Sequence, residues 1–329
     1  MKKTIKNLLP IFLAAVMLIA GMTSAQAKST TVFGDAGWDS MKFHNAVAML
    51  IAENAYDMDV SEISGSTAIT YNALKKGDID VYMETWTDSI APYVEDVKNG
   101  DVIELGVNYD DNIQGLYVPR YVIEGDAQRG IEPMAPDLKS VEDLKNYSEL
   151  FRDPEDPRKG RIYGAISGGE VDEIMRKKVE FYGLDEMYNY MDPGSDPALS
   201  AAISSAYEKG EPIVAYYWEP AWITGKYDLV LLEDAPYDPE LYLKGECACP
   251  AIRLTVAVNP TFYEENPEFS EFLSKYKTSS QLTSDALAYI DQNDAEYDEA
   301  AVWFLKEHDE LLDEWLSPEK AAMVREVLK

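Results

Sequence analysis

Residues Gly210–Leu229, GEPIVAYYWEPAWITGKYDL, carry the clearest structural signal in this chain. The run Ile213–Tyr217 is short, apolar and rich in β-branched and aromatic residues, which predicts a buried strand rather than a helix. Trp218, Glu219 and Trp222 follow at the point where this strand would end. Because ligands bind at the carboxyl ends of strands in open α/β sheets, these side chains are candidates for a binding site. The two tryptophans, four residues apart, could equally be one packed face of a helical turn.

Two further stretches have the same form. In Gly77–Asp88, GDIDVYMETWTD, apolar residues alternate as in a strand, and the run ends at Trp86. Near the start of the chain, Thr31–Phe33 predicts a short strand, and the glycine-containing turn Gly34–Ser40 that follows includes Trp38. Three tryptophans at predicted strand ends are difficult to explain by core packing alone. We therefore expect them to contribute to one site.

The first residues have the pattern of a secretory signal peptide. Three lysines precede the apolar run Leu8–Met22, and Ala25–Ala27 is an A-x-A cleavage pattern. The run is short for a membrane span, and no cysteine follows it that could be acylated. We expect residues 1–27 to be removed, giving an exported protein in the periplasm or at the extracellular face of a bacterial cell membrane, with no direct membrane insertion after cleavage.

The charge balance restricts the possible partners. The chain has a formal net charge of −31 at pH 7, and loss of the three lysines of the signal peptide would make it more acidic still. Nucleic acids and anionic membranes require basic surfaces, so neither is expected as a partner. A small neutral or cationic molecule, or another protein, fits this balance better.

Length and element order predict an α/β protein of two lobes. A mature chain of about 300 residues exceeds what one hydrophobic core normally contains. Predicted strands and helices alternate, which indicates mostly parallel sheets flanked by helices. Gly115–Pro119 and Arg253–Val258 are the predicted crossing strands. These place the first part of lobe 1 at residues 28–117, lobe 2 at 118–251, and the return segment of lobe 1, with its C-terminal helices, at 252–329.

A possible anion site lies in the predicted second lobe. The strand Arg161–Ala165 leads into the turn Ser167–Gly168–Gly169–Glu170, and a helix is predicted from Val171 to Tyr182. Free N–H groups at a helix N-terminus can bind a carboxylate. The alternative is a tight connection without a ligand, and the turn matches neither a phosphate loop nor a dinucleotide fingerprint.

The inventory of reactive side chains argues against an enzyme. The only histidines, His44 and His308, are not near a recognisable nucleophile motif. Cys247 and Cys249 lack partners at zinc-ligand spacing. We therefore expect no catalytic residue, no metal and no cofactor.

Together, the motifs GDIDVYMETWTD, KGRIYGAISGGE and EPIVAYYWEPAWITGKYDL resemble those of the substrate-binding proteins of ABC importers for glycine betaine, proline betaine and choline. The resemblance covers nearly the whole mature chain. It implies a type II-like periplasmic binding protein fold, in which two lobes close on a quaternary ammonium group held by aromatic rings. It also implies a membrane permease of an ABC importer as a partner.

The resemblance also assigns site residues. Trp86 and Trp218 are similar to cage walls from the first and second lobes, and Trp38 with Asp39 is similar to the tryptophan and acid of choline-type relatives. The turn at Ser167 is similar to the one that, in betaine-type relatives, carries a further tryptophan, which is absent here. Tyr117, Tyr217 or Trp222 are candidates to replace it. The predicted ligand-binding set is Trp38, Asp39, Trp86, Ser167, Gly168, Gly169, Trp218, Trp222 and Arg253.

These inferences predict a solute-binding protein for glycine betaine or a close relative, with choline or carnitine next. A different compatible solute is the alternative within the same class, because the turn lacks its aromatic residue. The alternative from another class is a secreted hydrolase that uses Glu219 or Asp39.

Overall fold

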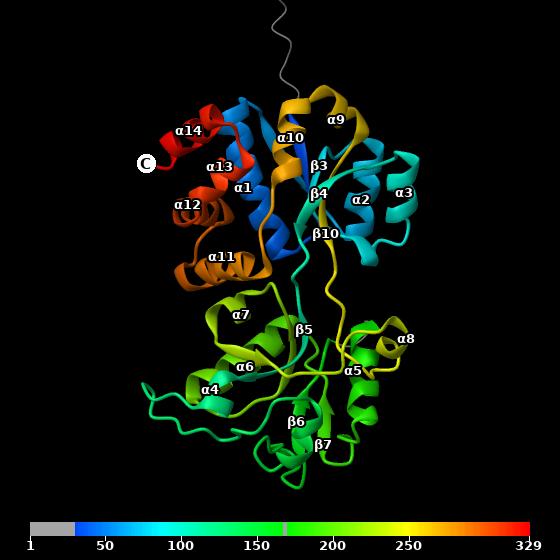
Figure 1. The fold of residues 1–329 in the computed structure, drawn as a ribbon, viewed down its shortest axis with the longest axis vertical. Helices are drawn as coiled ribbons and strands as arrows, with labels where there is room; N and C mark the ends of the chain where they lie inside the picture. The colour runs from blue at the N-terminus through cyan, green and yellow to red at the C-terminus, as the bar shows by residue number, and fades with distance from the viewer. Residues whose placement is uncertain (1–29, 167–169) are drawn as a thin grey trace, which may run out of the picture.

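A computed structural model describes residues 30–166 and 170–329. The chain forms two lobes, one above the other along the long axis, each built around a five-stranded sheet with helices beside it (Figure 1). Both sheets are mixed but mostly parallel, which confirms the predicted α/β class. Within the described ranges, every helix is too short or too polar to span a lipid bilayer.

The sheet of the first lobe has the order β2-β1-β3-β10-β4. Strands β1, β2 and β3 are parallel, whereas β10 is antiparallel to both of its neighbours, β3 and β4. All five residues of β10 are buried, as expected for a strand between two others that is covered on both faces. The strands are β1 (Thr31–Asp35), β2 (Val60–Ser64), β3 (Val81–Trp86), β4 (Ile103–Tyr109) and β10 (Leu254–Val258).

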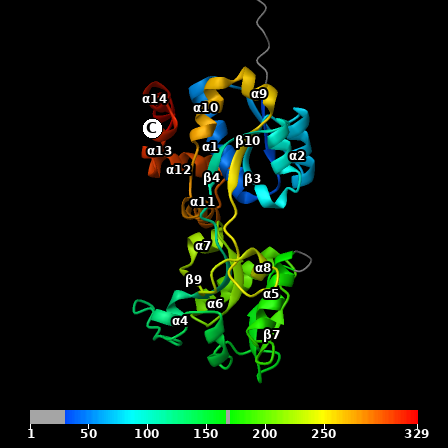
Figure 2. The ribbon, with the colours of Figure 1, turned by 45° about the vertical axis from the view of Figure 1, so that its right-hand side comes forward.

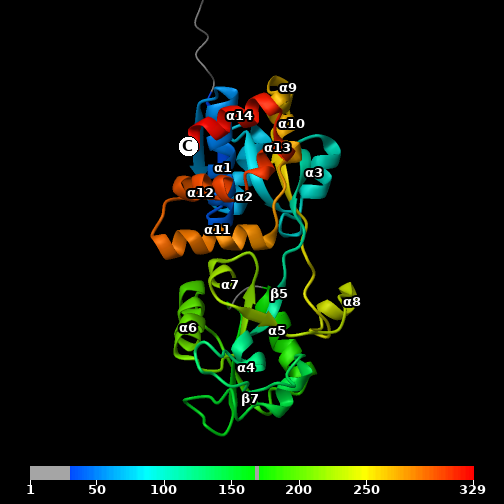
Figure 3. The same ribbon diagram turned by 60° about the vertical axis from the view of Figure 1, so that its left-hand side comes forward.

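Helix α1 (Asp39–Tyr56) contributes most to the core of the first lobe. Its residues Phe43, Val47 and Ile51 are fully buried against C-terminal helices, including Phe304 of α12. The predicted helical C-terminal segment is confirmed, and its helices pack against α1 (Figures 1 and 3). The other helices of this lobe are α2 (Thr67–Lys76), α3 (Tyr93–Asn99), α9 (Pro260–Glu265), α10 (Pro267–Lys275), α11 (Ser280–Asn293), α12 (Tyr297–Glu307), α13 (Glu310–Trp315) and α14 (Pro318–Val327), with the 3-10 turn η1 (Thr87–Ser89).

The sheet of the second lobe repeats this plan with the order β7-β6-β8-β5-β9. Here β5 is the antiparallel strand, paired with β8 and β9, while β6 is parallel to β7 and β8. The strands are β5 (Gln114–Pro119), β6 (Gly160–Tyr163), β7 (Tyr188–Met191), β8 (Ala215–Trp218) and β9 (Leu229–Leu231). The helices are α4 (Arg120–Glu124), α5 (Glu170–Phe181), α6 (Asp196–Lys209), α7 (Trp222–Lys226) and α8 (Pro239–Tyr242), with the 3-10 helix η2 (Glu142–Asn146).

Each antiparallel strand lies next to a passage of the chain between the lobes (Figure 2). The first passage follows β4 and precedes β5, so residues 114–117 pair within the second sheet, although the predicted boundary assigned them to the first lobe. Periodicity alone detects a strand here but does not indicate which sheet it joins. Strand β7 and helix α8 were not predicted.

The two passages are tied to each other by side chain–backbone hydrogen bonds. The backbone N–H of Ile252 donates to Asn112 Oδ1 at 2.9 Å, and Asn112 Nδ2 donates to the Ile252 carbonyl. Asn112 is only 3% exposed, so these bonds satisfy a buried amide. The two connections therefore form one unit where the lobes meet.

The lobes also touch through helices α7 and α11. The backbone N–H of Ala221 donates to Ser284 Oγ at 3.1 Å, and Lys226 pairs with Asp291 at 2.7 Å. A Cβ at Gly225 would lie 2.2 Å from the carbonyl oxygen of Ser284, so glycine permits this close approach. Figures 1 and 3 show α11 lying directly over α7.

A buried ion pair holds the second lobe together. The Lys178 ammonium on α5 is 2% exposed and donates to the Asp234 carboxylate and to the carbonyl of Cys247. The Tyr182 hydroxyl also donates to Asp234, at 2.5 Å. These bonds fasten α5 to the segment that leads back toward the first lobe.

We expect Lys178→Met to lower the free energy of unfolding by about 3 to 5 kcal/mol, because it leaves the Asp234 carboxylate buried without its cation. Urea unfolding followed by circular dichroism measures the change. The matched control is Lys177→Met, since the exposed Lys177 donates only to the carbonyl of Leu243 and should matter by less than about 1 kcal/mol. Equal stabilities for the two variants would contradict the assigned role of the buried pair.

Candidate functional site

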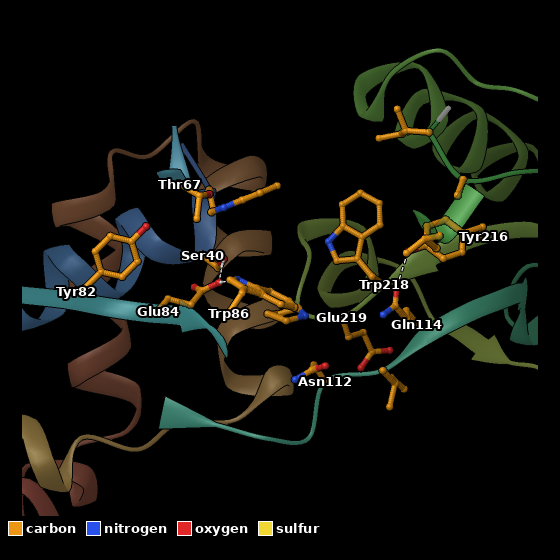
Figure 4. A pocket seen from close by; sticks show the side chains of 16 residues that line it. Ser40, Thr67, Tyr82, Glu84, Trp86, Asn112, Gln114, Tyr216, Trp218 and Glu219 are labelled. Carbon is orange, nitrogen blue, oxygen red and sulfur yellow. Dashed lines mark hydrogen bonds between the residues drawn. The ribbon is translucent and has the colours of Figure 1, made fainter. Parts of the chain in front are cut away.

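A cavity of about 410 Å³ lies between the lobes. Its lining comes from both sheets and from the connections between them, and aromatic side chains project into it from either side (Figure 4). The lining residues are Trp38, Ser40, Thr67, Tyr82, Glu84, Trp86, Asn112, Ile113, Gln114, Ala165, Ile166, Val171, Tyr216, Trp218, Glu219 and Pro220.

Two tryptophans of the first lobe reach the cavity because β1 and β3 are parallel neighbours. Phe33 of β1 is in register with Val81 of β3, so the carboxyl ends of both strands meet at the same edge of the sheet. Trp86 is the last residue of β3, and Trp38 immediately precedes α1, just after β1. The Trp38 side chain is 52% exposed, which leaves much of its ring free to contact a ligand.

Glu84 lies behind Trp86 and holds its indole. Glu84 Oε1 accepts hydrogen bonds from Trp86 Nε1 at 2.7 Å and from Ser40 Oγ at 3.0 Å (Figure 4). The residue is 1% exposed, and this burial raises the pKa of its carboxyl to about 7, against the opposing effect of the hydrogen bonds from Ser40 and Trp86. Tyr82, Glu84 and Trp86 share one face of β3 because side chains alternate along a strand.

The second lobe presents Trp218 from the end of β8. Its ring stacks on Tyr217, with centroids 4.5 Å apart and planes 16° from parallel. Tyr216 lines the cavity and donates to Gln114 Oε1 at 2.7 Å, on the neighbouring strand β5 (Figure 4). The carboxyl of Glu219 accepts from Tyr117 Oη at 3.3 Å, and burial raises its pKa. These contacts fix one aromatic wall and one acid in the second lobe.

The backbone just after β6, at Gly164 and Ala165, is held by a polar network. The backbone N–H of Ala165 donates to Tyr190 Oη at 2.9 Å, and that hydroxyl donates to Asp172 Oδ1 at 2.9 Å. Arg176 pairs with Asp172 at 3.1 Å and lies over the Tyr190 ring. A Cβ at Gly164 would come within 2.1 Å of that ring, so this segment requires glycine there.

The structure brings together three of the predicted residues, Trp38, Trp86 and Trp218. Asp39 is adjacent but is not part of the lining, and its carboxylate accepts from Tyr297 Oη at 2.7 Å on the first lobe. Ser167, Gly168 and Gly169 lie outside the described residues.

Trp222 and Arg253 are also outside the lining. Trp222 packs against the cores of both lobes, and the Lys226 ammonium lies 5.3 Å from its ring centroid. Arg253 pairs with Glu104 at 2.8 Å on the first sheet. Of the candidates to replace the missing aromatic, Tyr117 and Tyr217 pack in the core of the second lobe.

Several lining residues were not predicted, above all Glu84, Ser40 and Tyr216. Glu84 could have been found, because it stands two residues before Trp86 on a predicted strand and must share its face. Tyr216 could have been found in the same way, because it stands two residues before Trp218. Ser40 carries no such signal, since its position depends on how α1 packs.

The described lining is aromatic and acidic. It includes the carboxyl groups of Glu84 and Glu219 but no lysine, arginine or histidine. Within the described ranges, no group of three or more histidine, cysteine or acidic residues is arranged to hold a metal ion. Aromatic faces and carboxylates attract cations, so this cavity is suited to a positively charged group.

The fold and the cavity between the lobes define the class of this protein as a two-lobed solute-binding protein. A family model described as the substrate-binding domain of an ABC-type glycine betaine transport system matches residues 29–307. The chain belongs to this family, which serves transport rather than catalysis. The hydrolase alternative is therefore not supported.

Solved structures show the same fold. The glycine betaine/L-proline-binding protein ProX from Borrelia burgdorferi is 20% identical with a TM-score of 0.59, over 90% of this chain and all of the other. Lactococcal OpuAC, closed on glycine betaine, is 20% identical with a TM-score of 0.58, over 88% of this chain and all of the other. An ABC-transporter choline-binding protein in complex with choline is 20% identical with a TM-score of 0.57, over 91% and 98% of the two chains.

We expect Glu84→Gln to remove a pH dependence of stability. The folded-state pKa, about 7, lies above the ordinary value of 4.5, so the folded protein binds more protons than the unfolded chain between these values. Stability contributed by neutral Glu84 is therefore lost as pH rises through this window, by on the order of 3 kcal/mol. Urea unfolding at several pH values should show the variant gaining stability relative to the parent as pH rises.

The control for this measurement is Glu53→Gln, which removes the same charge from an exposed position on α1. It should follow the parent at every pH. A constant stability difference between Glu84→Gln and the parent would show that Glu84 has no raised pKa.

Proposed function

We propose that this protein captures a quaternary ammonium osmolyte in an aromatic cage between its lobes and delivers it to the permease of an ABC importer. The observation that carries this proposal is that Trp86 and Trp218, at the ends of β3 and β8, line one cavity from opposite lobes (Figure 4). Trp38 adds a third ring from the first lobe.

An aromatic cage can supply much of the binding free energy of a micromolar complex. A cation over one aromatic face contributes about 0.5 to 2 kcal/mol, depending on desolvation, so three faces contribute roughly 2 to 6 kcal/mol. A micromolar complex requires about 8 kcal/mol. Burial of the methyl groups against the rings and hydrogen bonds to the other end of the ligand supply the remainder. Aromatic rings suit this ligand because a quaternary ammonium has no N–H to donate.

Glycine betaine is the first candidate ligand, since the description of the matching family names it. Choline and carnitine follow, and another compatible solute is the alternative, because the sequence of the turn at Ser167 lacks an aromatic residue. The signal-peptide pattern of residues 1–27 supports capture outside the cytoplasm, where an importer would receive the solute.

We expect Trp86→Ala and Trp218→Ala each to weaken binding of glycine betaine and choline by more than tenfold. Each change removes one ring's attraction for the cation and its share of methyl burial, together above the roughly 1.4 kcal/mol that a factor of ten requires. Isothermal titration calorimetry on folded variants measures the affinities. Leucine at either position keeps apolar contact but loses the negative ring face, and should recover only part of the affinity.

The control is Trp303→Ala. Trp303 stacks on Tyr289 with centroids 4.4 Å apart, within the C-terminal helices, and does not line the cavity between the lobes. Its truncation should reduce stability and leave affinity unchanged. Parent-like binding by both folded cage variants would refute the aromatic cage.

We also expect saturating ligand to close the lobes, because walls of the cavity come from both and neither half is complete alone. Hinge closure is absorbed by a few residues. The sequence places them near Val118–Arg120 and Ala251–Arg253, and the second of these segments lies beside the Asn112 contact. Val118 and Pro119 pair with Val230 and Leu229 inside the second sheet, so we expect the first hinge before β5, near Asn112. Small-angle X-ray scattering should show a smaller radius of gyration with ligand. An unchanged radius at saturation proven by calorimetry would contradict closure.

A further inference from the structure

Glu84 is a buried acid without a cationic partner. It is 1% exposed, yet no lysine, arginine or histidine of the described chain forms an ion pair with it. Two other carboxylates with little exposure do have a cationic partner: Asp96 is paired with Lys75 at 2.6 Å, and Asp234 with Lys178. A buried carboxylate without a counter-charge is costly when ionised, and a bound cation would remove that cost.

We propose that Glu84 makes the cage selective for quaternary ammonium compounds that carry a net positive charge, such as choline, over zwitterions such as glycine betaine. The proposal rests on the function proposed above and reverses the order of its candidate ligands.

The contact with Trp86 transmits the charge of Glu84 to the cage. The indole N–H donates to Glu84 Oε1 at 2.7 Å, in the plane of the ring, so the carboxylate leaves the ring faces free. A negative charge at the edge of the indole makes those faces more attractive to a cation. The same bond fixes the orientation of Trp86, with Ser40 Oγ as the second donor.

The other end of a ligand decides the selectivity. Glycine betaine carries a carboxylate, which is repelled by Glu84 and by Glu219 across the cavity, while its ammonium is attracted. In a zwitterion these effects oppose each other. Choline carries a neutral hydroxyl in place of the carboxylate, so it keeps the full attraction. The described lining offers no basic side chain to a ligand carboxylate.

Glu84 and Glu219 are the acids in the lining of the cavity whose pKa values are raised by burial. The titratable groups around Glu84 are the following. Burial raises the pKa of Tyr82 to about 12, and raises the pKa values of Tyr109 and Tyr276 well above the usual range of tyrosine. The pKa of His44, which contacts Tyr109 and Tyr276, is lowered by burial to about 3. The carboxylate of Asp35 nearby accepts from Gly37 N and Ser64 Oγ.

The test measures choline and glycine betaine affinities by calorimetry for the parent, Glu84→Gln, Glu219→Gln and Glu53→Gln. Glutamine keeps an oxygen that accepts from Trp86 and Ser40, so the change removes mainly the charge. We expect Glu84→Gln to lower choline affinity about tenfold and glycine betaine affinity less than about threefold. The exposed control Glu53→Gln should keep the parent's choline-to-betaine ratio.

A second measurement uses the unaltered protein. Because a cation favours ionised Glu84, choline binding should release a proton, and affinity should fall about tenfold from about pH 8.5 to about pH 5.5. Glu219→Gln should retain this slope, and Glu84→Gln should lose it. This measurement tests the proposal even if Glu84→Gln does not fold.

The outcomes separate the two proposals. If the parent binds both ligands through Trp86 and Trp218 but prefers glycine betaine, or if its preference and pH slope survive in Glu84→Gln, the selectivity proposal is overturned and the cage remains. If the parent binds neither ligand, or the tryptophan variants bind as the parent does, the cage itself is refuted and the role of Glu84 with it. A choline preference that disappears with Glu84→Gln supports both.

Discussion

The hydrogen bonds between Asn112 and the backbone of Ile252 are the contact on which the arrangement of this molecule depends. The chain passes between the lobes twice, and these bonds join the two passages beside the cavity. Because β5 and β10 continue from the passages into the middle of the two sheets, the strand ends that carry Trp86 and Trp218 are held toward each other. The geometry of the site therefore depends on the connection between the lobes as well as on the lobes themselves.

Buried charged side chains of the two lobes are stabilised in different ways. The charges of Lys178 and Asp234 compensate each other, so this buried ion pair links two segments of the second lobe. Glu84 lacks such compensation and is stabilised only by neutral donors. A buried acid without a counter-charge lowers the stability of the folded protein. Such destabilising groups are common at ligand-binding sites, where their charge contributes to recognition.

The contact of α7 with α11 adds a third connection between the lobes. Its close approach at Gly225 and its ion pair between Lys226 and Asp291 place the lobes in a defined orientation. Trp222, predicted as a cage residue, instead packs at this contact. A tryptophan one helical turn beyond Trp218 thus serves the interface between lobes rather than the cavity wall.

The sequence by itself determined the α/β class, most helices and strands, and the three tryptophans that line the cavity, because periodicity and strand-end position are local properties. The alternation of side chains along a strand also puts Glu84 on the face of Trp86 and Tyr216 on the face of Trp218, although neither residue was predicted. Only the tertiary structure decided which sheet residues 114–117 join, that Trp222 and Arg253 lie outside the lining, and that Ser40 enters it. Those outcomes depend on strand pairing and helix packing between residues far apart in the chain, and no local pattern encodes such contacts.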